Sequence, residues 1–313
     1  MSSTHKADMI EILLATCNGK QYIREQIDSI LTQSFSDWHL TVSDDGSTDE
    51  TIAIIDDYQF RYPEKIRRIC SRKIFGTARD HFFWLLRNCT ADYICFSDQD
   101  DVWKPDKLQL FADRMREMEE TEGKNTPILV FSDLCVVDEA LNVISDSIMY
   151  LQQQKANVAD YHELLFKNVV NGNAMMINRA LADISLQCLA PEKTIMHDWW
   201  TAIAAAKFGK ISYIDCATVL YRQHGGNDVG AKKARGIGFI LRKLTHLKML
   251  LASFDQKAAQ ARVFLDTFRG ELEPEECLLL MPFSQREMSL REKLVFCKWL
   301  TSASRKIGFL LLW

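Results

Sequence analysis

Short apolar runs and amphipathic segments alternate along the first third of the chain. Runs of about four to eight apolar residues predict buried strands, and apolar residues that recur every three or four positions predict helices. Strands are predicted at residues 9–15, 39–43, 66–71 and 93–97, and helices at residues 21–32, 48–60 and 81–88. This alternation predicts a parallel sheet with right-handed crossovers and helices on both faces. Ligands of such sheets bind at the carboxyl ends of the strands.

The pattern changes in the second half of the chain. Strands are predicted there at residues 128–133, 173–178 and 211–221, and helices at residues 161–166 and 197–207. After Gly230 the pattern is helical to the end, with helices predicted at residues 236–254, 256–268, 274–281 and 285–312. We therefore expect one α/β domain at residues 1–230, followed by a helical region at residues 231–313.

Composition and charge limit the classes of protein that fit this pattern. With 313 residues, of which 47% are hydrophobic and 26% charged, the chain can bury one large core or a core plus an appendage. The formal net charge of −4 argues against binding nucleic acid through bulk charge. From Gly230 onward, however, Lys and Arg outnumber Asp and Glu by about 15 to about 8, which predicts an anionic partner for the tail.

The cysteines and the first residues of the chain indicate a compartment. The nine Cys residues show no spacing typical of a metal site, and most lie in apolar stretches, as Cys95 and Cys135 do. Buried thiols in a reducing compartment are therefore expected rather than disulfides. Residues 1–8 are polar, and no run reaches the roughly 18 apolar residues of a membrane-spanning helix. We expect a cytoplasmic protein without a signal sequence.

Two polar loops follow the first two predicted strands. Thr16 and Asn18 lie in the first loop, and Asp44 and Asp45 begin the second. An Asn-Gly turn commonly connects a strand to a helix, and residues 47–49 are good helix caps, so part of both loops has an ordinary structural explanation. Two adjacent carboxylates at a strand end are not explained in that way. The Asp44 carboxylate is suited to accept the imino N–H of a pyrimidine base.

Three acids, Asp98, Asp100 and Asp101, directly follow the predicted strand at residues 93–97. Asp98 and Asp100 are two residues apart, and in an extended segment that spacing puts both side chains on one side. Paired carboxylates attract a hard divalent cation, which in turn neutralises a diphosphate. The alternative is a solvated acidic turn before a helix. The buried strand before the acids and the apolar residues after them favour the functional interpretation.

Two later motifs complete the candidate site. Asp198 stands between a His and two Trp residues at the start of a predicted helix, which suits a general base held in a partly apolar wall. The alternative for Asp198 is a helix N-cap. Arg222 and His224 follow the last predicted strand, where they suit a phosphate partner and a metal ligand, although a lone His is more often structural.

The ordered stretches ATCNG, DDGSTD, FSDQDDVW and HDWW resemble family 2 glycosyltransferases, which are inverting enzymes of the GT-A fold. The stretches MHDWW and LYRQHGG are similar to the bacterial rhamnosyltransferase branch of that family, which adds L-rhamnose from dTDP-rhamnose to lipid-linked polysaccharide precursors. The resemblance covers roughly residues 9–230, with a weaker echo in the C-terminal helices. It implies an α/β fold of the GT-A (nucleotide-diphospho-sugar transferase) type. Such a fold has a Rossmann-like, mixed but mostly parallel sheet with helices on both faces, here followed by a C-terminal helical region.

The resemblance also implies a role for each candidate residue. The residues implied at the nucleotide-sugar donor are Thr16, Asn18, Asp44, Asp45, Asp98 and Arg222. Those implied at the acceptor are Asn171, Gly172, Asn173 and Trp199. Asp100, the second acid of the DxD pair, and His224 are implied as ligands of Mg²⁺ or Mn²⁺, and Asp198 as the base that activates the acceptor hydroxyl.

The chain departs from the family pattern at three places. Cys17 replaces the more usual Tyr, so stacking on the nucleobase is expected to be weaker. Residues 74–76 read Ile-Phe-Gly where Asn-Leu-Gly is more usual, which puts one donor contact in doubt. Gly226 and Asp228 vary the usual HGNNV run.

We therefore predict a metal-dependent, inverting glycosyltransferase that moves L-rhamnose from dTDP-β-L-rhamnose to a hydroxyl of a lipid-linked saccharide. One displacement from the face opposite the diphosphate inverts the anomeric centre, so no covalent nucleophile is needed. A hexosyltransferase that uses a UDP-sugar is the alternative within the class. A phosphohydrolase would need an aspartate nucleophile at the end of the first strand, where residues 15–17 offer none. The intact pair Asp98 and Asp100, together with Asp198, argues against a non-catalytic sugar-nucleotide-binding module.

The helical region carries an apolar stripe with basic flanks. The apolar positions are Phe239, Ile240, Leu241, Leu244, Leu247, Leu250 and Leu251, and the basic ones are Arg235, Arg242, Lys243 and Lys248. A basic amphipathic helix can lie in the interface of an anionic membrane. The alternatives are packing on the α/β domain or on a second subunit, which would give a homo-oligomer. The basic excess, and the lipid-linked acceptors of the family that the chain resembles, favour peripheral contact with the inner face of the cell membrane.

Overall fold

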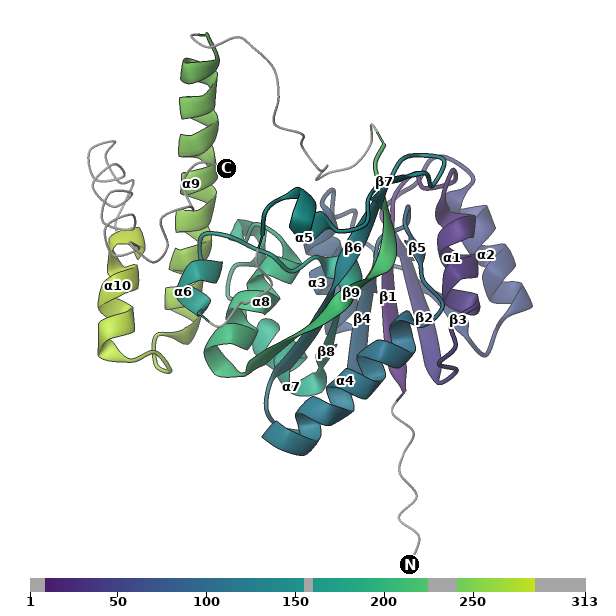
Figure 1. Cartoon of the computed structure of the whole chain (residues 1–313), viewed down its shortest axis with the longest axis horizontal. Helices are drawn as coiled ribbons and strands as arrows, with labels where there is room; N and C mark the ends of the chain where they lie inside the picture. Colours follow the sequence, from purple (N-terminus) through teal and green to yellow (C-terminus); the bar gives the residue numbers. More distant parts are fainter. Residues whose placement is uncertain (1–8, 155–159, 225–240, 285–313) are drawn as a thin grey trace, which may run out of the picture. The chain divides into compact units, whose positions relative to one another are not determined.

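The computed structural model describes residues 9–154, 160–224 and 241–284 of the chain (Figure 1). These residues fold into two compact units. The first unit holds the described residues of 9–164, 168–187 and 196–224 and contains the sheet. The second holds residues 165–167, 188–195 and 241–284. The domain boundary expected near Gly230 lies outside the described residues and stays a prediction.

A single mixed sheet forms the centre of the first unit. Along the path of hydrogen-bonded neighbours, its strands are β3 (Ile66–Ile69), β2 (Trp38–Asp44), β1 (Ile10–Thr16), β4 (Tyr93–Ser97), β8 (Met175–Asn178), β6 (Ile128–Val137), β9 (Lys210–Arg222) and β5 (Val102–Trp103). The short β7 (Val143–Ser145) pairs with β6 beside this path. The strands β1 to β4 pair in parallel with one another, whereas β8 is antiparallel to both of its neighbours. The mixed, mostly parallel sheet expected for the GT-A fold is therefore confirmed.

The direction of β8 decides which loops meet. Because β8 is antiparallel to β4, its first residue lies beside the end of β4. β9 is parallel to β6, so its last residue, Arg222, reaches the same edge. The carboxyl ends of β1, β2, β4 and β9 and the start of β8 therefore share one edge of the sheet. We refer to it below as the carboxyl edge.

Helices cover both faces of the sheet (Figure 1). They are α1 (Ile23–Leu31), α2 (Thr51–Arg61), α3 (Ala78–Arg87), α4 (Lys107–Glu122), α5 (Ile148–Leu151), α6 (Tyr161–Leu164), α7 (Arg179–Ser185) and α8 (His197–Phe208). Neighbouring residues of a strand point to opposite faces, and β4 illustrates this. The ring of Phe96 packs against Phe82 of α3 and His197 of α8, whereas Cys95 lies on the face of Lys107 in α4.

The sequence pattern missed the helices α4, α5 and α7 and the short strands β5 and β7, and it misread two other elements. Residues 173 and 174 were expected in a strand but belong to the 3₁₀ turn η1 (Gly172–Ala174), and the strand begins at Met175. The expected break at residue 255 is absent, because α9 (Leu241–Phe268) runs through it without a Gly or Pro to interrupt the backbone hydrogen bonds. The predicted helix at residues 285–312 lies outside the described residues.

The second unit consists of α9, α10 (Pro274–Ser284) and two short segments from earlier in the chain, one of which contains the turn η2 (Pro191–Lys193). Phe264, Leu265 and Phe268 are buried in its core. The earlier segment is tied to α9 by a hydrogen bond of 2.9 Å from the Ile195 amide to the side-chain oxygen of Gln260. Within the described residues, no helix combines the length and the apolar character needed to cross a membrane.

Candidate active site

The loops that follow β1 and β2 are joined by their candidate donor residues. Thr16 donates its hydroxyl to Asp44 at 2.8 Å, and the amide of Thr48 donates to the side-chain oxygen of Asn18 at 2.9 Å. The Asp44 carboxylate also accepts from the amides of Gly46 and Ser47 at 3.0 and 2.8 Å. Asp44 thus orders its own turn, in addition to the base contact expected of it. Gly46 has a φ of 86°, which the turn requires and which favours glycine.

Asp45 connects the second loop to the segment that departs from the family pattern. Its two carboxylate oxygens accept from the backbone amides of Phe75 and Gly76, at 2.5 and 2.7 Å. The side chain of Ile74, 71% exposed, lies directly over Gly46. Asp45 therefore fixes residues 74–76 beside the Asp44 turn, whichever side chain stands at position 74.

Gln99 joins the first loop to the acidic loop, and the sequence analysis did not single it out. Its amide donates to the carbonyl of Cys17 at 3.0 Å and accepts from the Cys17 amide at 2.9 Å. Gly19 leaves room for this side chain, since a Cβ there would lie only 2.1 Å from the Gln99 side-chain oxygen. The pairing of a glycine after β1 with a long amide between two acids was the signal in the sequence.

The acidic loop after β4 brings three carboxyl groups together at the carboxyl edge. Burial, together with the neighbouring carboxylates, raises the pKa of Asp98 well above its ordinary value. Burial and the charge of Asp100 raise the pKa of Asp101 to about 7. Lys107, at the start of α4, is completely buried near these acids, and burial lowers its pKa to about 7. Nothing in the local sequence pattern marks Lys107 as part of the site.

The end of β9 is held against the acidic loop. The imidazole of His224 lies 2.8 Å from a carboxylate oxygen of Asp100, so the two residues expected as metal ligands are adjacent. The Arg222 side chain, 2% exposed, donates to the carbonyl of Asp100 at 2.8 Å, to the carbonyl of Glu139 at 2.5 Å and to the Glu25 carboxylate at 2.5 Å. The direct phosphate contact expected of Arg222 stays a prediction.

Asp198 is the second residue of α8, and the N-cap of that helix is Met196, so the N-cap alternative is wrong. Its carboxylate accepts from the amide of Gly172 at 2.9 Å and from that of Trp199 at 2.5 Å. Burial raises the pKa of Asp198 to about 7. A carboxylate with a pKa near neutrality can take up and release a proton under ordinary conditions, as a general base must.

The residues around Asp198 form a tight, partly apolar wall. His197 is buried between Phe82 and Phe96, and within the described residues its ring nitrogens have no hydrogen-bond partner. A Cβ at Gly172 would lie 2.9 Å from that ring, so glycine lets the loop reach Asp198. The Trp199 indole donates to the carbonyl of Leu164.

Three of the four residues expected beside the acceptor lie just before β8, and the fourth, Trp199, lies in α8. The Asn171 carbonyl accepts from Ala174 at 3.0 Å, and the Gly172 amide donates to Asp198. The Asn173 amide donates to Asp101. The structure thus brings together Asp100 with His224, Gly172 with Asp198, and Asn173 with the acidic loop.

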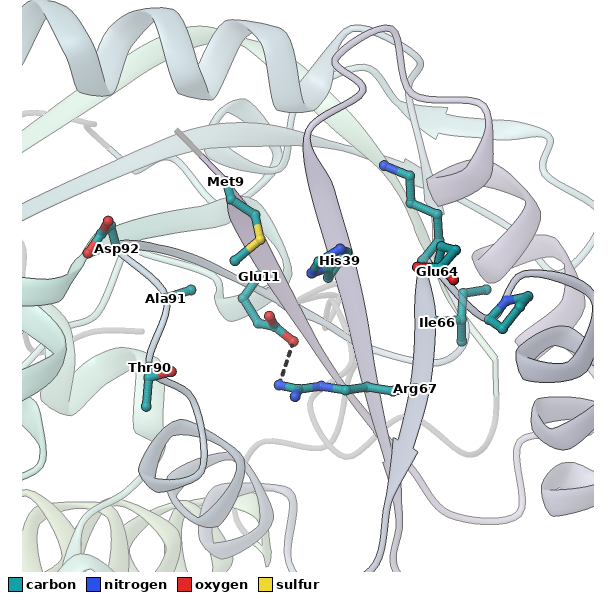
Figure 2. Close-up of a pocket in the computed structure, with 11 residues that line it drawn as sticks. Met9, Glu11, His39, Glu64, Ile66, Arg67, Thr90, Ala91 and Asp92 are labelled. Carbon is teal, nitrogen blue, oxygen red and sulfur yellow. Dashed lines mark hydrogen bonds and ion pairs between the residues drawn. The ribbon is translucent and has the colours of Figure 1, made fainter. Parts of the chain in front are cut away.

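A separate cavity of about 450 Å³ lies at the opposite edge of the sheet (Figure 2). It is lined by residues at the amino ends of β1, β2 and β3, including Glu11, His39 and Arg67. Glu11 and Arg67 form an ion pair of 3.2 Å there. None of the candidate site residues lines this cavity, so it is not part of the site described above.

The acidic loop has the donor set of a divalent-cation site that a ligand must complete. Within the described part of the chain, no group of three or more His, Cys, Asp or Glu side chains is arranged to hold a metal ion by itself. Asp100 and His224 provide one hard oxygen and one nitrogen, and the crowding of Asp98, Asp100 and Asp101 favours a positive ion. The residues present therefore fit a cation that also binds the oxygens of a diphosphate.

Comparison with known proteins agrees with this geometry. The sequence profile of Glycosyl transferase family 2 matches residues 11–121. The dTDP-rhamnosyl transferase RfbG of Shigella flexneri is 31% identical over 234 residues, which cover 70% of this chain and 74% of RfbG.

Two solved structures have a similar fold. The crystal structure of residues 1–349 of TarS from S. aureus, also solved in complex with UDP, superposes with a TM-score of 0.59 at 16% identity, covering 96% of this chain and 74% of that one. The mannosyltransferase PcManGT from Pyrobaculum calidifontis, in complex with GDP-Man and Mn²⁺, has a TM-score of 0.50 at 15% identity, covering 96% and 83%.

The mixed, mostly parallel sheet with helices on both faces has the GT-A fold. On the similarity to RfbG and the family profile, the chain belongs to glycosyltransferase family 2.

Proposed function

We propose that this glycosyltransferase transfers L-rhamnose from dTDP-β-L-rhamnose to a hydroxyl of a lipid-linked saccharide, with inversion at the anomeric carbon. The observation that carries the reaction type is Asp198. It is a carboxylate with a pKa of about 7, held by the Gly172 amide just before β8, beside the strand β4 that the acidic loop follows. The choice of rhamnose rests on the similarity to RfbG, a dTDP-rhamnosyl transferase.

The donor nucleotide binds over the loops after β1 and β2. Thr16, Asn18 and Asp44 contact the base and ribose, and Asp45 acts by holding residues 74–76 at the edge of the same pocket. Asp98 contacts the ribose. Cys17 stands where a ring would stack on the base, so binding depends more on polar contacts than in relatives that carry Tyr at this position.

A divalent cation, Mg²⁺ or Mn²⁺, would be held by Asp100 and His224 together with the donor diphosphate. When bound, it supplies positive charge to the leaving nucleoside diphosphate. The Mn²⁺ of PcManGT supports this proposal. Arg222 acts on the same group by keeping the backbone of Asp100 and the end of β9 in place.

Asp198 takes the proton from the acceptor hydroxyl as the oxygen attacks the anomeric carbon. The bond to the sugar forms on the face opposite the diphosphate, which departs with the electron pair of the broken bond, so one displacement inverts the centre. The Gly172 amide orients the carboxylate, and the buried His197 ring holds the loop that carries that amide. Asn171 and Trp199 line the acceptor side.

A UDP-hexose is the second candidate donor. The complex of TarS with UDP-GlcNAc supports it, because the same fold there binds a uridine nucleotide. Thymine differs from uracil by one methyl group, and the described loops are compatible with either base.

The test is a donor screen that follows release of the nucleoside diphosphate. The purified full chain is incubated with Mn²⁺ and with dTDP-β-L-rhamnose, UDP-glucose or UDP-GlcNAc, and with octyl glycosides of N-acetylglucosamine and rhamnose as acceptors. We expect the fastest release with dTDP-rhamnose and an α-linked rhamnoside by NMR. A clear preference for a UDP-sugar would overturn the choice of donor, and a β-linked rhamnoside formed from dTDP-β-L-rhamnose would overturn inversion.

A further inference from the structure

The third acid of the acidic loop has no part in the mechanism above, yet it is the most deeply buried of the three. Asp101 is 0% exposed, whereas Asp98 and Asp100 are partly accessible. A buried carboxylate destabilises a fold unless its oxygens are hydrogen-bonded. One Asp101 oxygen accepts from the backbone amide of Arg222 at 3.0 Å, and the other accepts from the side-chain amide of Asn173. Asp101 therefore joins two segments that are far apart in the sequence.

Arg222 leads from Asp101 to the donor side of the site. Its guanidinium donates to the carbonyl of Asp100 and to Glu25 of α1, and it lies over the ring of Tyr22 at 4.5 Å. The same ring contacts His224 at a centroid distance of 4.9 Å. The backbone bond to Asp101 thus fixes the strand end from which His224 reaches Asp100.

Asn173 leads from Asp101 to the acceptor side. It directly follows Gly172, whose amide donates to Asp198 at 2.9 Å. The Asn173 carbonyl accepts from the ammonium group of Lys107, which is buried and lies 3.3 Å from the centroid of the Trp103 ring. The acidic loop therefore holds the side chain of Asn173, and Lys107 of α4 holds its backbone. These two contacts also fix the loop whose Gly172 amide orients Asp198.

We propose that Asp101 is a positioning residue, which sets the distance between the acceptor base Asp198 and the donor side at Asp100 and His224 through its bonds to Asn173 and Arg222. We call this set of residues, Asp101, Asn173, Arg222 and Lys107, the Asp101 bracket. Its catalytic consequence rests on the proposed function, in which Asp198 accepts the acceptor proton. A displacement of about 1 Å between reacting groups can lower a rate by about 10²-fold. Loss of the bracket is therefore expected to impair transfer to the acceptor far more than binding of the donor.

Asn173→Ala is the main test variant, because it breaks the link to Asp101 and leaves the Arg222 bond in place. Asn178→Ala is the matched control. Asn178 is an equally buried Asn at the other end of β8, where it donates to the carbonyl of Thr126 at 2.8 Å and accepts from the Ile128 amide at 2.9 Å. Both substitutions remove a buried side-chain amide, one in the turn η1 just before β8 and the other at the last residue of β8, but the control does so away from the carboxyl edge. Asp101→Val breaks the link from its other end.

Three quantities are measured on the full chain: turnover with an octyl glycoside acceptor, hydrolysis of the donor without acceptor, and hydrogen–deuterium exchange of the Gly172 amide. For Asn173→Ala we expect about 10²-fold slower transfer, donor hydrolysis close to that of the wild type, and faster exchange at Gly172. The double variant Asp101→Val/Asn173→Ala should transfer no more slowly than Asp101→Val alone, because Asp101→Val already breaks the link between Asp101 and Asn173. The control should change stability without changing the ratio of transfer to hydrolysis.

The outcome that overturns the proposal is a ratio of transfer to hydrolysis in Asn173→Ala that equals that of Asn178→Ala, or unchanged exchange at Gly172. Additive losses in the double variant would also overturn it. If Asp101→Val does not fold, Asn173→Ala and its control still decide the matter. A wild-type protein that transfers no sugar would instead contradict the proposed function, and the exchange measurement would still test the bracket.

Discussion

Asp198 combines a position beside the acceptor loop with a pKa of about 7, and burial is the main cause of that pKa. The raised value means that burial favours the neutral form, so the stability of the fold falls as the pH rises from 3.8, the ordinary pKa of the carboxyl, to about 7. The protein is therefore less stable than it would be with a neutral residue at this position, but it keeps a carboxylate whose affinity for a proton suits a general base.

We expect Asp198→Asn to fold, bind the donor nucleotide and lose transfer by about 10²–10⁴-fold, since a general base typically contributes that much. The Asn oxygen can still accept from Gly172, and the neutral side chain avoids the cost of a buried charge, so the melting temperature should be unchanged or higher above pH 7. Calorimetric titration with dTDP, turnover and thermal unfolding would measure these effects. Asp183→Asn, on an exposed acid of α7, is the control. Normal transfer by Asp198→Asn would mean that the base lies elsewhere.

The rate of transfer should rise as the pH increases through about 7, because the base form of Asp198 is the carboxylate. Below that pH the rate should fall about tenfold per pH unit, as the carboxylate fraction does. A pH–rate profile at saturating donor measures this. Titration of the nearby Asp98 carboxyl, whose pKa is also raised, can affect the same part of the pH–rate profile. The decisive comparison is therefore with Asp198→Asn, whose residual rate should not rise with pH in this range. A profile for the wild type that is flat from about pH 5.5 to 8 would contradict the assignment.

Activity should disappear when the protein is stripped with chelator and return with Mn²⁺ or Mg²⁺, because Asp100 and His224 lie 2.8 Å apart with carboxylates around them. Asp100→Ala and His224→Ala should each weaken Mn²⁺ binding in the presence of dTDP by at least about tenfold. Asp92→Ala, at the opposite edge of the sheet, should not. Full turnover by the stripped protein would rule out a required metal ion.

The element scale shows where sequence pattern suffices and where it does not. The strands β1, β2 and β4 and the helices between them were predicted because apolar runs alternate with amphipathic segments there. The direction of β8 was not, because the same apolar residues suit a parallel or an antiparallel neighbour. α4 was missed because its polar residues, many of them acidic, obscure the buried face of Leu108, Phe111 and Met115. The loops at strand ends were found through their residue types, but their cross-links through Gln99, Asp101 and Lys107 join residues far apart in the sequence.

The contact between Gly19 and Gln99 ties the first loop to the acidic loop, and Gly19→Ala should break it. The added Cβ would displace the Gln99 side chain, which holds both backbone groups of Cys17. We expect the affinity for dTDP to fall by about tenfold or more, because the loops around the nucleotide are no longer held in fixed positions relative to each other. Calorimetry with Gly270→Ala as the control would test this, since a Cβ at Gly270 meets no atom within 4 Å. Equal affinities would mean that the loops hold their positions without this contact.

At the scale of the whole molecule, the open question is what binds the C-terminal helical region, in which Lys and Arg outnumber Asp and Glu. Residues 225–240 and 285–313 lie outside the described residues, as do the side chains of residues 241–252, so the proposed amphipathic stripe stays a prediction. We propose peripheral contact with the inner face of the cell membrane through this stripe. A second copy of the chain on the same helices remains the alternative, and would give a homo-oligomer.

We expect the full chain to float with anionic liposomes and not with neutral ones, because each Lys or Arg near an anionic surface contributes about 1 kcal/mol. The combined substitution of Arg242, Lys243 and Lys248 by Glu should abolish flotation. Flotation should be unchanged when three exposed basic residues of the first unit, Lys20, Arg61 and Lys124, are replaced by Glu. If all three proteins behave alike on both liposomes, light scattering should reveal the oligomer instead.

The antiparallel β8 has a consequence for how such enzymes diversify. In the sheet it lies between β4, which belongs to an early segment of the chain from β1 to α4, and β6, which begins a late segment from β6 to β9, and the family profile ends with the early segment at residue 121. On the proposed assignment, recombination between α4 and β6 would combine the nucleotide-binding residues of one enzyme with the acceptor-binding residues of another. The bonds of Asp101 to Asn173 and Arg222 cross that junction, so a chimera should work only when both parents carry residues that can restore them.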